Sequence, residues 1–172
     1  MSNTPKYLII HHTGGSDSNP LSDSSNFTFE QCDKLHEEKF NMKSSLGHYI
    51  GYHYYIEKDG KTVQGRADTD EGAHTIGYNS QSLGICLAGN FDLTLPTLQQ
   101  IDSLRKLLKE KREEFDIDIN KILPHRMFAK KTCYGNNLPN EWARNLVINR
   151  EEILAKVVSL ITEATSLLAL IK

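Results

Sequence analysis

A histidine and a cysteine lie close together in residues 122–135, ILPHRMFAKKTCYG. His125 and Cys133 are eight positions apart, and Lys131 comes two positions before the cysteine. A neutral imidazole and a thiolate are both good zinc ligands. Two protein ligands leave zinc under-coordinated, so a third is needed, and His11 in YLIIHHTGG is the candidate. Three protein ligands with a fourth position left for water are typical of a catalytic zinc rather than a structural one.

Taken singly, each of these residues has a structural alternative. A histidine after an apolar strand is more often part of the fold than a ligand, and the separation of His125 from Cys133 is not a common zinc-finger spacing. The other two cysteines, Cys32 and Cys86, are far from Cys133 in the sequence, so the three do not form a disulfide framework. Cys86 lies in the apolar run SLGICLAG, which predicts a buried core residue.

The first candidate ligand comes at the end of a predicted strand. Residues 6–12, KYLIIHH, form a short apolar run that ends at Thr-Gly-Gly, which is typical of a buried strand. Side chains alternate along a strand, so His11 and His12 point to opposite faces and only one can face a site. Residues 16–26 are rich in Ser, Asn and Asp and predict a loop.

Further strands are predicted in the middle of the chain. Residues 48–57, HYIGYHYYIE, are aromatic and β-branched, which is typical of a strand. The following Lys-Asp-Gly-Lys sequence predicts a hairpin turn, and residues 62–66 are the expected return strand. Residues 82–88 form another apolar run and predict a second buried strand.

Two helices are predicted around these strands. Residues 28–42 form a partly apolar helix, in which Thr28 and Gln31 fit a capping box. Residues 96–115 form a clearly amphipathic helix with leucines at helical spacing and a proline near its start. The expected fold class is therefore α/β (α+β), with a mixed central β-sheet flanked by helices.

The C-terminal segment, residues 149–172, is more apolar than a helix that stays bare in water. Three arrangements are open: packing back on the domain, self-association through a coiled-coil-like seam, or contact with a membrane. Three glutamates and the lack of a basic face count against membrane binding and against a stable span. We predict a catalytic domain over residues 1–148, a separate C-terminal helix, and a dimer or higher oligomer formed through it. The seam consists of Leu154, Val157, Ile161, Ala164, Leu168 and Ile171.

The composition is that of one soluble globular domain. The chain has 172 residues, of which 38% are hydrophobic and 24% charged. Basic and acidic residues nearly balance, with a net charge of -2, which argues against a nucleic-acid binder driven by phosphate charge. The N-terminal sequence lacks a secretory pattern, so the protein is expected to be made in a cytosol.

Four segments in this order resemble one family. They are YLIIHHTGG, GYHYYIEKDGKTVQGR, GAHTIGYNSQSLGICLAGNF and PHRMFAKKTC. Together they resemble the zinc N-acetylmuramoyl-L-alanine amidases of the peptidoglycan-recognition-protein fold, and among these the single-domain endolysins of bacteriophages. The resemblance covers about residues 6–146 and leaves the C-terminal helix outside.

The resemblance implies a Zn²⁺ cofactor and a set of site residues. His11, His125 and Cys133 match the metal ligands of the family. Tyr52 matches a catalytic tyrosine, and Lys131 matches a catalytic lysine of the phage branch. A sheet flanked by helices with zinc in a groove on one side is the expected architecture.

Substrate contacts are also implied by the resemblance. His12 follows the first ligand as a common neighbour, and His53 and His74 match histidines near the groove. Asn79 is a further candidate for substrate binding. The chain departs from the family pattern after the cysteine ligand, where many members have proline and this chain has Tyr134.

The implied reaction is hydrolysis of the amide that joins N-acetylmuramic acid to L-alanine in peptidoglycan. Zinc would lower the pKa of a bound water towards about 7 and polarise the carbonyl. The expected role is that of a phage endolysin, made in the cytoplasm of the bacterial host and acting on the wall after release. The alternative is a module that binds peptidoglycan without cutting it, although non-catalytic members of the fold characteristically lack the cysteine ligand.

Overall fold

A five-stranded sheet forms the centre of the protein. The computed structural model describes residues 2–16, 18–148 and 150–169. In this part of the chain the sheet has the strand order β3-β2-β4-β1-β5. The strands are β1 (Tyr7–His12), β2 (Tyr54–Ile56), β3 (Thr62–Gln64), β4 (Ser82–Leu87) and β5 (Ile122–Pro124). The α-helices are α1 (Phe29–Phe40), α2 (Leu98–Phe115), α3 (Trp142–Asn145) and α4 (Arg150–Ala169).

Because β1 and β5 are parallel, their carboxyl ends lie at the same end of the sheet. β1 pairs in parallel with β4 on one side and with β5 on the other. β2 is also parallel to β4, and only the pairing of β3 with β2 is antiparallel. The sheet is therefore mixed, as predicted. In sheets of this kind, ligand sites lie beyond the carboxyl ends of the parallel strands.

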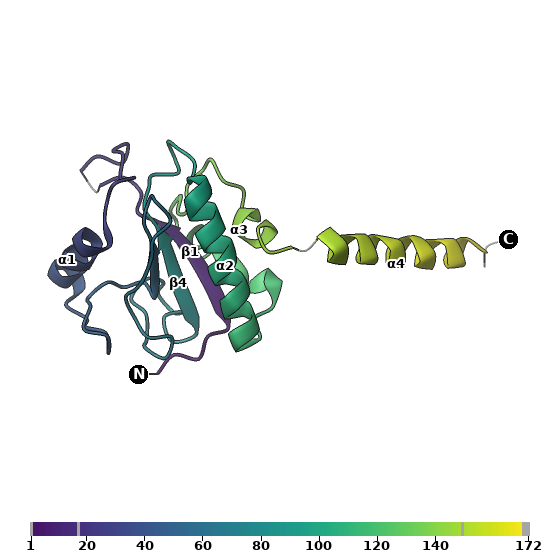
Figure 1. Ribbon diagram of the computed structural model, residues 1–172, viewed down its shortest axis with the longest axis horizontal. Coiled ribbons are helices and arrows are strands. Elements are labelled where there is room, and N and C mark those ends of the chain that lie inside the picture. The colour runs from purple at the N-terminus through teal and green to yellow at the C-terminus, as the bar shows by residue number, and fades with distance from the viewer. Residues whose placement is uncertain (1, 17, 149, 170–172) are drawn as a thin grey trace.

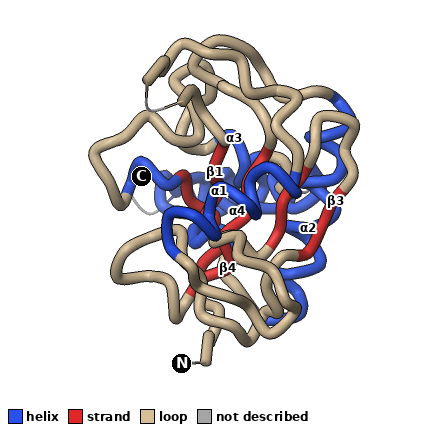
Figure 2. The backbone as a smooth tube through the Cα atoms, turned by 90° about the vertical axis from the view of Figure 1, so that its left-hand side faces the viewer, coloured by secondary structure: helices blue, strands red, loops and turns tan. Residues whose placement is uncertain are grey.

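Each face of the sheet packs against a different helix. One core contains Leu8 and Ile10 of β1 together with Leu104 and Leu108 of α2. The other core joins Cys86 of β4 to α1 and to the segment that precedes β2. Figure 1 shows α1 and α2 on opposite sides of the sheet. Figure 2, seen from the α1 side, shows the strands in the middle and long loops at both ends.

Both long helices of this core begin at threonine capping boxes. Thr28 caps α1 and Thr97 caps α2, and in each case the side chain accepts the N–H of the glutamine three residues later. The glutamine side chains, Gln31 and Gln100, accept the N–H groups of the two threonines in return. These reciprocal bonds satisfy N–H groups that a helix cannot pair internally. The predicted helices over residues 28–42 and 96–115 are thus confirmed, with slightly shorter bounds.

One predicted strand needs correction, and one observed strand was not predicted. The strand expected over residues 48–57 is reduced to Tyr54–Ile56, and residues 48–53 are irregular. The backbone N–H groups of residues 49–51 are bound by side chains of α1, which removes them from strand pairing. The short strand β5 was not predicted, because three residues that end in proline carry no strand pattern.

The helix α4 extends away from the rest of the protein (Figure 1). Its described large apolar side chains are 44–62% exposed. Of the three arrangements left open by the sequence, packing back on the domain is not the one this structure adopts. Among the described residues, no helix is both long enough and apolar enough to cross a membrane. The last seam residue, Ile171, lies outside the described residues.

Candidate metal centre

Three residues from two distant parts of the chain meet beyond the sheet edge. His11 is the fifth residue of β1, and His125 follows directly after β5. Cys133 returns to the same place at the end of the loop after β5. The ligand atoms of these residues all lie within 4.8 Å of one another. The parallel pairing of β1 with β5 thus brings His11 and His125 together across more than a hundred positions of sequence, with ring centroids 4.5 Å apart.

The geometry of this cluster fits a tetrahedral zinc ion. Nδ1 of His11 lies 3.7 Å from Sγ of Cys133. Zinc bonds of about 2.0 Å to nitrogen and about 2.3 Å to sulfur place these atoms about 3.5 Å apart. Nε2 of His11 lies 3.1 Å from Nδ1 of His74 and can donate its proton there. A ligand histidine that donates its second N–H in this way is held in one tautomer and one orientation.

Space for His74 comes from a glycine in β4. A Cβ atom added to Gly84 would lie 2.5 Å from the His74 ring, closer than van der Waals contact permits. The imidazole therefore packs directly on the backbone of the sheet next to β1. Asn79 holds the loop that carries it, because its Oδ1 accepts the N–H groups of His74 and Thr75. His74 and Asn79 therefore belong to the same loop. His74 contacts the candidate ligand His11, and Asn79 stabilises the loop.

The protonation states of the ligands differ. Burial, together with the neighbouring His74 and His125, lowers the pKa of His11 well below its usual range. Burial and the charge of Lys131 lower the pKa of His125 to about 4. Both imidazoles are therefore neutral at pH 7 and have a free electron pair for a metal. Burial raises the pKa of Cys133 to about 12, against the opposing effects of the His12 N–H and of Lys131.

These pKa values predict that zinc binding releases about one proton near neutral pH. The histidines are already deprotonated above about pH 5, whereas the thiol must lose its proton to bind the metal. Raising the pH favours the thiolate, so zinc affinity should rise about tenfold per pH unit between pH 6 and 8. Calorimetric titration in buffers with different protonation enthalpies measures the proton count. Release of two protons at pH 6, below the pKa of about 7 that zinc gives to a bound water, would mean that a ligand histidine is protonated before binding.

Arg126 organises the loop that carries the cysteine. Its guanidinium donates to the carbonyl oxygens of Thr132 at 3.3 Å and Gly135 at 2.8 Å, and also to that of Leu138. Its backbone N–H donates to the carbonyl of Cys133. The residue thus links the helical turn of His125 to both sides of Cys133. No role for Arg126 was predicted, because its position next to His125 in the sequence does not reveal which groups its long side chain contacts.

Asp92 holds the same loop from the opposite side. One carboxylate oxygen accepts the Thr132 hydroxyl at 2.6 Å, and the other accepts the Asn136 N–H at 2.7 Å. The thiol itself receives the backbone N–H of His12 at 3.4 Å. Donation to sulfur favours the thiolate, so the position of Cys133 supports its ionised form once a cation is present.

The two residues predicted to be catalytic lie beside the cluster. The Tyr52 ring is half-buried, with its centroid 5.0 Å from that of His11. Burial raises the pKa of Tyr52 well above its usual range, and nearby thiols, first Cys86, raise it further. Its hydroxyl is therefore protonated at neutral pH. Lys131 is exposed, and its charge lowers the pKa of both His125 and Cys133, so it acts electrostatically on the cluster.

Two of the residues predicted to bind substrate are engaged elsewhere. His12 points to the other face of the sheet, where Nδ1 accepts the Phe91 N–H at 3.0 Å. His53 has no exposed surface, and its Nδ1 accepts the Gly84 N–H at 3.0 Å. The expectation of direct substrate contact is therefore corrected for His53, which lies inside the fold. His12 contributes its backbone N–H to the centre rather than its ring.

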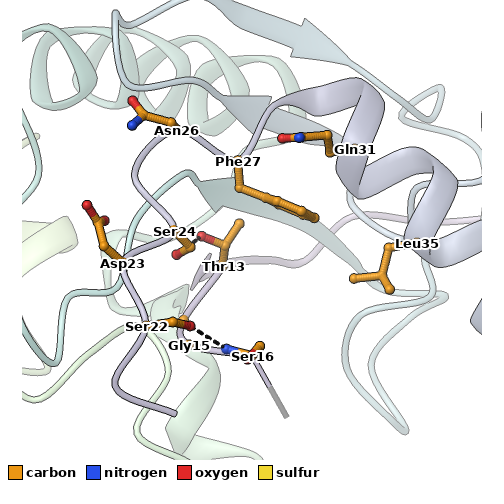
Figure 3. A pocket seen from close by; sticks show the side chains of 11 residues that line it. Thr13, Gly15, Ser16, Ser22, Asp23, Ser24, Asn26, Phe27, Gln31 and Leu35 are labelled. Carbon is orange, nitrogen blue, oxygen red and sulfur yellow. Dashed lines mark hydrogen bonds between the residues drawn. The ribbon is translucent and has the colours of Figure 1, made fainter. Parts of the chain in front are cut away.

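A cavity of about 370 Å³ begins just after β1 (Figure 3). Hydroxyl, amide and carboxylate groups line it together with two apolar side chains, Phe27 and Leu35. Its wall is fixed by a hydrogen bond of 2.7 Å between the hydroxyls of Thr13 and Ser24, and by donation from the Ser16 N–H to the Ser22 hydroxyl at 3.0 Å. The lining residues are Thr13, Gly14, Gly15, Ser16, Ser22, Asp23, Ser24, Asn26, Phe27, Gln31 and Leu35.

Comparison with solved structures identifies close relatives of this fold. N-acetylmuramoyl-L-alanine amidase LysC from Clostridium intestinale URNW is 30% identical, with a TM-score of 0.66, and the match covers 90% of this chain and 86% of that one. The ectodomain complex of peptidoglycan recognition proteins LCa and LCx bound to tracheal cytotoxin contains a chain that is 23% identical, with a TM-score of 0.64 over 80% of this chain and 81% of that one. The second likeness is one of fold.

Relatives in sequence come from both phages and animals. Peptidoglycan-recognition protein SC2 of Drosophila melanogaster is 30% identical over 142 residues, which are 82% of this chain and 74% of that protein. The endolysin of Escherichia phage T7 is 32% identical over 108 residues, which are 59% of this chain and 70% of that protein. The model of the N-acetylmuramoyl-L-alanine amidase family matches residues 1–136. Since this match spans the sheet, both of its long flanking helices and the candidate metal ligands, the chain belongs to the N-acetylmuramoyl-L-alanine amidase family.

Proposed function

We propose that this protein is a zinc-dependent hydrolase that cuts the amide between N-acetylmuramic acid and L-alanine in peptidoglycan. The observation that carries the proposal is the convergence of His11, His125 and Cys133 beyond the carboxyl ends of β1 and β5. Two neutral imidazoles and one ionisable thiol form a donor set suited to zinc. The likeness to amidases such as LysC supports the same reaction class.

A zinc ion held by His11, His125 and Cys133 would supply Lewis acidity to the scissile carbonyl and to a water molecule. The chain must then manage the proton and the developing negative charge. Tyr52 retains its proton at neutral pH, so its hydroxyl serves as a hydrogen-bond donor to oxygen rather than as a base. Lys131 brings a positive charge to the place where the tetrahedral intermediate becomes anionic.

His74 completes the centre by accepting the second N–H of His11. Its own pKa is held well below the usual range, first by burial and then by the nearby His53. It is therefore neutral at physiological pH, and its Nδ1 is available as an acceptor. The cavity beyond Thr13 offers hydroxyl and amide groups beside an aromatic ring, and we assign it to a part of the muropeptide outside the scissile bond.

The direct test is metal analysis paired with an assay on purified sacculi. We expect about one zinc per chain and release of soluble peptides with new amino termini. Removal of the metal by a chelator should abolish the release, and addition of zinc should restore it. Cleavage that persists after complete removal of the metal would contradict the proposal, as would a purified protein unable to bind zinc.

A module that recognises peptidoglycan without cutting it is the second candidate. It is favoured by the relatedness to peptidoglycan-recognition proteins, a group named for recognition rather than for hydrolysis. The presence of Cys133 in the cluster favours the enzyme. Zinc bound at one equivalent, with retention on sacculi and no new amino termini, would decide for the recognition module.

We further propose that the enzyme is a phage endolysin, made in the cytoplasm of the bacterial host and acting on the wall after release. The similarity to the endolysin of Escherichia phage T7 supports this role. Expression inside a bacterium together with a membrane-permeabilising agent should cause lysis, whereas the same agent with a metal-ligand variant should not.

The exposed helix α4 is proposed to join copies of the chain. Its described apolar side chains recur at heptad-like spacing and lack a partner within the described part of the chain. We predict a mass in light scattering of at least twice the 19.5 kDa of one chain. Ile161→Glu should reduce the mass to that of a monomer, because a charge in the seam opposes burial of apolar neighbours.

Thr162→Glu is the matched control for this change. Thr162 is the next residue of α4 but lies outside the seam, and its hydroxyl donates to the carbonyl of Val158. This variant should keep the mass of the unmodified protein. A full-length chain that is monomeric at all concentrations tested would rule out self-association through α4.

A further inference from the structure

The segment before Tyr52 is held by α1 rather than by strand pairing. Oδ1 of Asp33 accepts the N–H groups of Tyr49 at 2.6 Å and Ile50 at 2.7 Å. Nδ1 of His36 accepts the N–H of Gly51 at 2.8 Å. Asp33 and His36 are three residues apart in α1, so they share one side of the helix. Three consecutive N–H groups are thus fixed by two side chains of one helical turn.

His36 also contacts the side chain that follows this segment. Its ring centroid lies 5.4 Å from that of Tyr52, and the Tyr52 ring lies 5.0 Å from that of His11. A continuous path of contacts therefore runs from α1 through Tyr52 to a candidate metal ligand. Burial, aided by the nearby Lys39 and Arg66, lowers the pKa of His36 to about 4. The imidazole is therefore neutral at pH 7 and remains an acceptor.

Gly51 also contacts a second loop of the site, the one that carries His74. Its carbonyl accepts the N–H of Ala73 at 2.9 Å, directly before His74. A Cβ atom added to Gly51 would lie 2.3 Å from the Ala73 carbonyl oxygen, so the two backbones are in direct contact. Gly51 therefore lies between His36 and the loop whose histidine bonds His11.

Arg66 donates hydrogen bonds to backbone carbonyl groups of the Tyr52 segment and of two neighbouring segments. The buried guanidinium donates to Ile50 at 2.7 Å, Met42 at 2.6 Å and Glu71 at 3.0 Å. Arg66 thereby connects the end of α1, the Tyr52 segment and the His74 loop. His36 contacts both the backbone before Tyr52 and the Tyr52 ring.

We propose that His36 is a positioning residue for Tyr52: by accepting the Gly51 N–H and contacting the tyrosine ring, it sets where the Tyr52 hydroxyl stands at the metal centre. The inference rests on the proposed function, because a set position of Tyr52 matters for rate only if the hydrolysis takes place there. A shift of about 1 Å in a group that acts on the reacting atoms lowers rates by up to about a hundredfold.

Two substitutions separate the hydrogen bond from the packing of the ring. His36→Phe keeps an aromatic ring beside Tyr52 but removes the acceptor for Gly51. His36→Asn places an amide oxygen close to where Nδ1 stands and can accept the same N–H. Glu38→Gln, at an exposed position of α1, is the matched control. All of these are made in the full-length, zinc-loaded protein.

We expect His36→Phe to lower kcat about tenfold, with KM within twofold of the unmodified protein and one zinc per chain retained. His36→Asn should recover most of kcat, and Glu38→Gln should equal the unmodified protein. A His36→Phe variant with unchanged kcat would overturn the proposal, as would an Asn variant as slow as the Phe variant. A loss of bound zinc in His36→Phe would also overturn it, since the ligands and not the tyrosine would then be affected.

A spectroscopic readout keeps this test independent of activity. The chain has seven tyrosines, and 3-fluorotyrosine labelling gives each a ¹⁹F signal, with that of Tyr52 assigned through Tyr52→Phe. The Tyr52 signal should move in His36→Phe and return in His36→Asn. This result would uphold the positioning role even if the protein proved unable to cut peptidoglycan. An unmoved signal would overturn it whatever the activity.

Discussion

Replacing Cys133 by serine is expected to abolish zinc binding and peptidoglycan hydrolysis together. A neutral hydroxyl is a poor substitute for a thiolate as a zinc ligand. The loss of zinc affinity should exceed the roughly 10–100-fold that loss of an outer partner costs, because a direct ligand is removed. Competition with a chromophoric chelator measures the affinity, and release of amino termini from sacculi measures the activity.

Cys32→Ala is the matched control for this experiment. Cys32 is as buried as Cys133 but lies in α1, within the apolar core on that side of the sheet. Its loss should leave one zinc per chain. Retention of a full equivalent of zinc and of activity in Cys133→Ser would require a different set of ligands. A loss of zinc in both variants would point to a general loss of structure, which circular dichroism of the two proteins would detect.

The strand that carries the first ligand, β1, and its neighbour β4 were predictable from their sequences alone. β1 and β4 are apolar on both faces, and a run of this kind bounded by glycine is recognisable without knowledge of its partners. The alternation of His11 and His12 also followed from strand geometry, and the structure places their rings on opposite faces. The meeting of His11 with Cys133 was a hypothesis from residue types that the resemblance strengthened, since spacing alone does not bring residues 122 positions apart together.

The segment before Tyr52 was mispredicted for a physical reason. Aromatic and β-branched residues favour strands, but a strand also needs a neighbour with free N–H and C=O groups. Here the N–H groups of residues 49–51 are taken by Asp33 and His36. Side-chain acceptors from a helix leave no periodic trace in the sequence, so neither the irregular segment nor the two residues that hold it could be predicted.

Two arginines, the buried Arg66 and the half-buried Arg126, have roles that could not be read from the sequence. Arg66 and Arg126 each donate to three backbone carbonyls of the loops around the centre. Irregular loops leave carbonyl groups without strand or helix partners, and burying such groups unpaired is costly. A guanidinium has five donors in a rigid plane and can satisfy several of them at once. The loops around the candidate metal centre therefore depend for their shape on long side chains rather than on regular structure.

Replacing Lys131 by alanine is expected to lower kcat by about 10²–10³-fold while one zinc per chain remains bound. The lysine is exposed, and it acts on the cluster by charge, which lowers the pKa of His125 and Cys133. Its removal takes away a positive charge that matters most when the attacked carbonyl becomes anionic. KM should change far less than kcat, because the substrate amide is neutral before attack.

Lys130→Ala tests whether the loss of kcat in Lys131→Ala depends on the position of the lysine or only on its charge. Lys130 is the preceding residue, is equally exposed and carries the same charge, yet it is not among the groups that affect the pKa of the ligands. We expect this variant to keep most of its kcat, whereas Lys131→Ala does not. Equal losses of kcat in the two variants would mean that general attraction of an anionic wall polymer limits the rate. In that case both losses should also become smaller as salt is added, because salt screens the attraction. A loss confined to Lys131 and insensitive to salt would instead place its ammonium group at the reacting carbonyl, where neighbouring protein shields it from ions in solution.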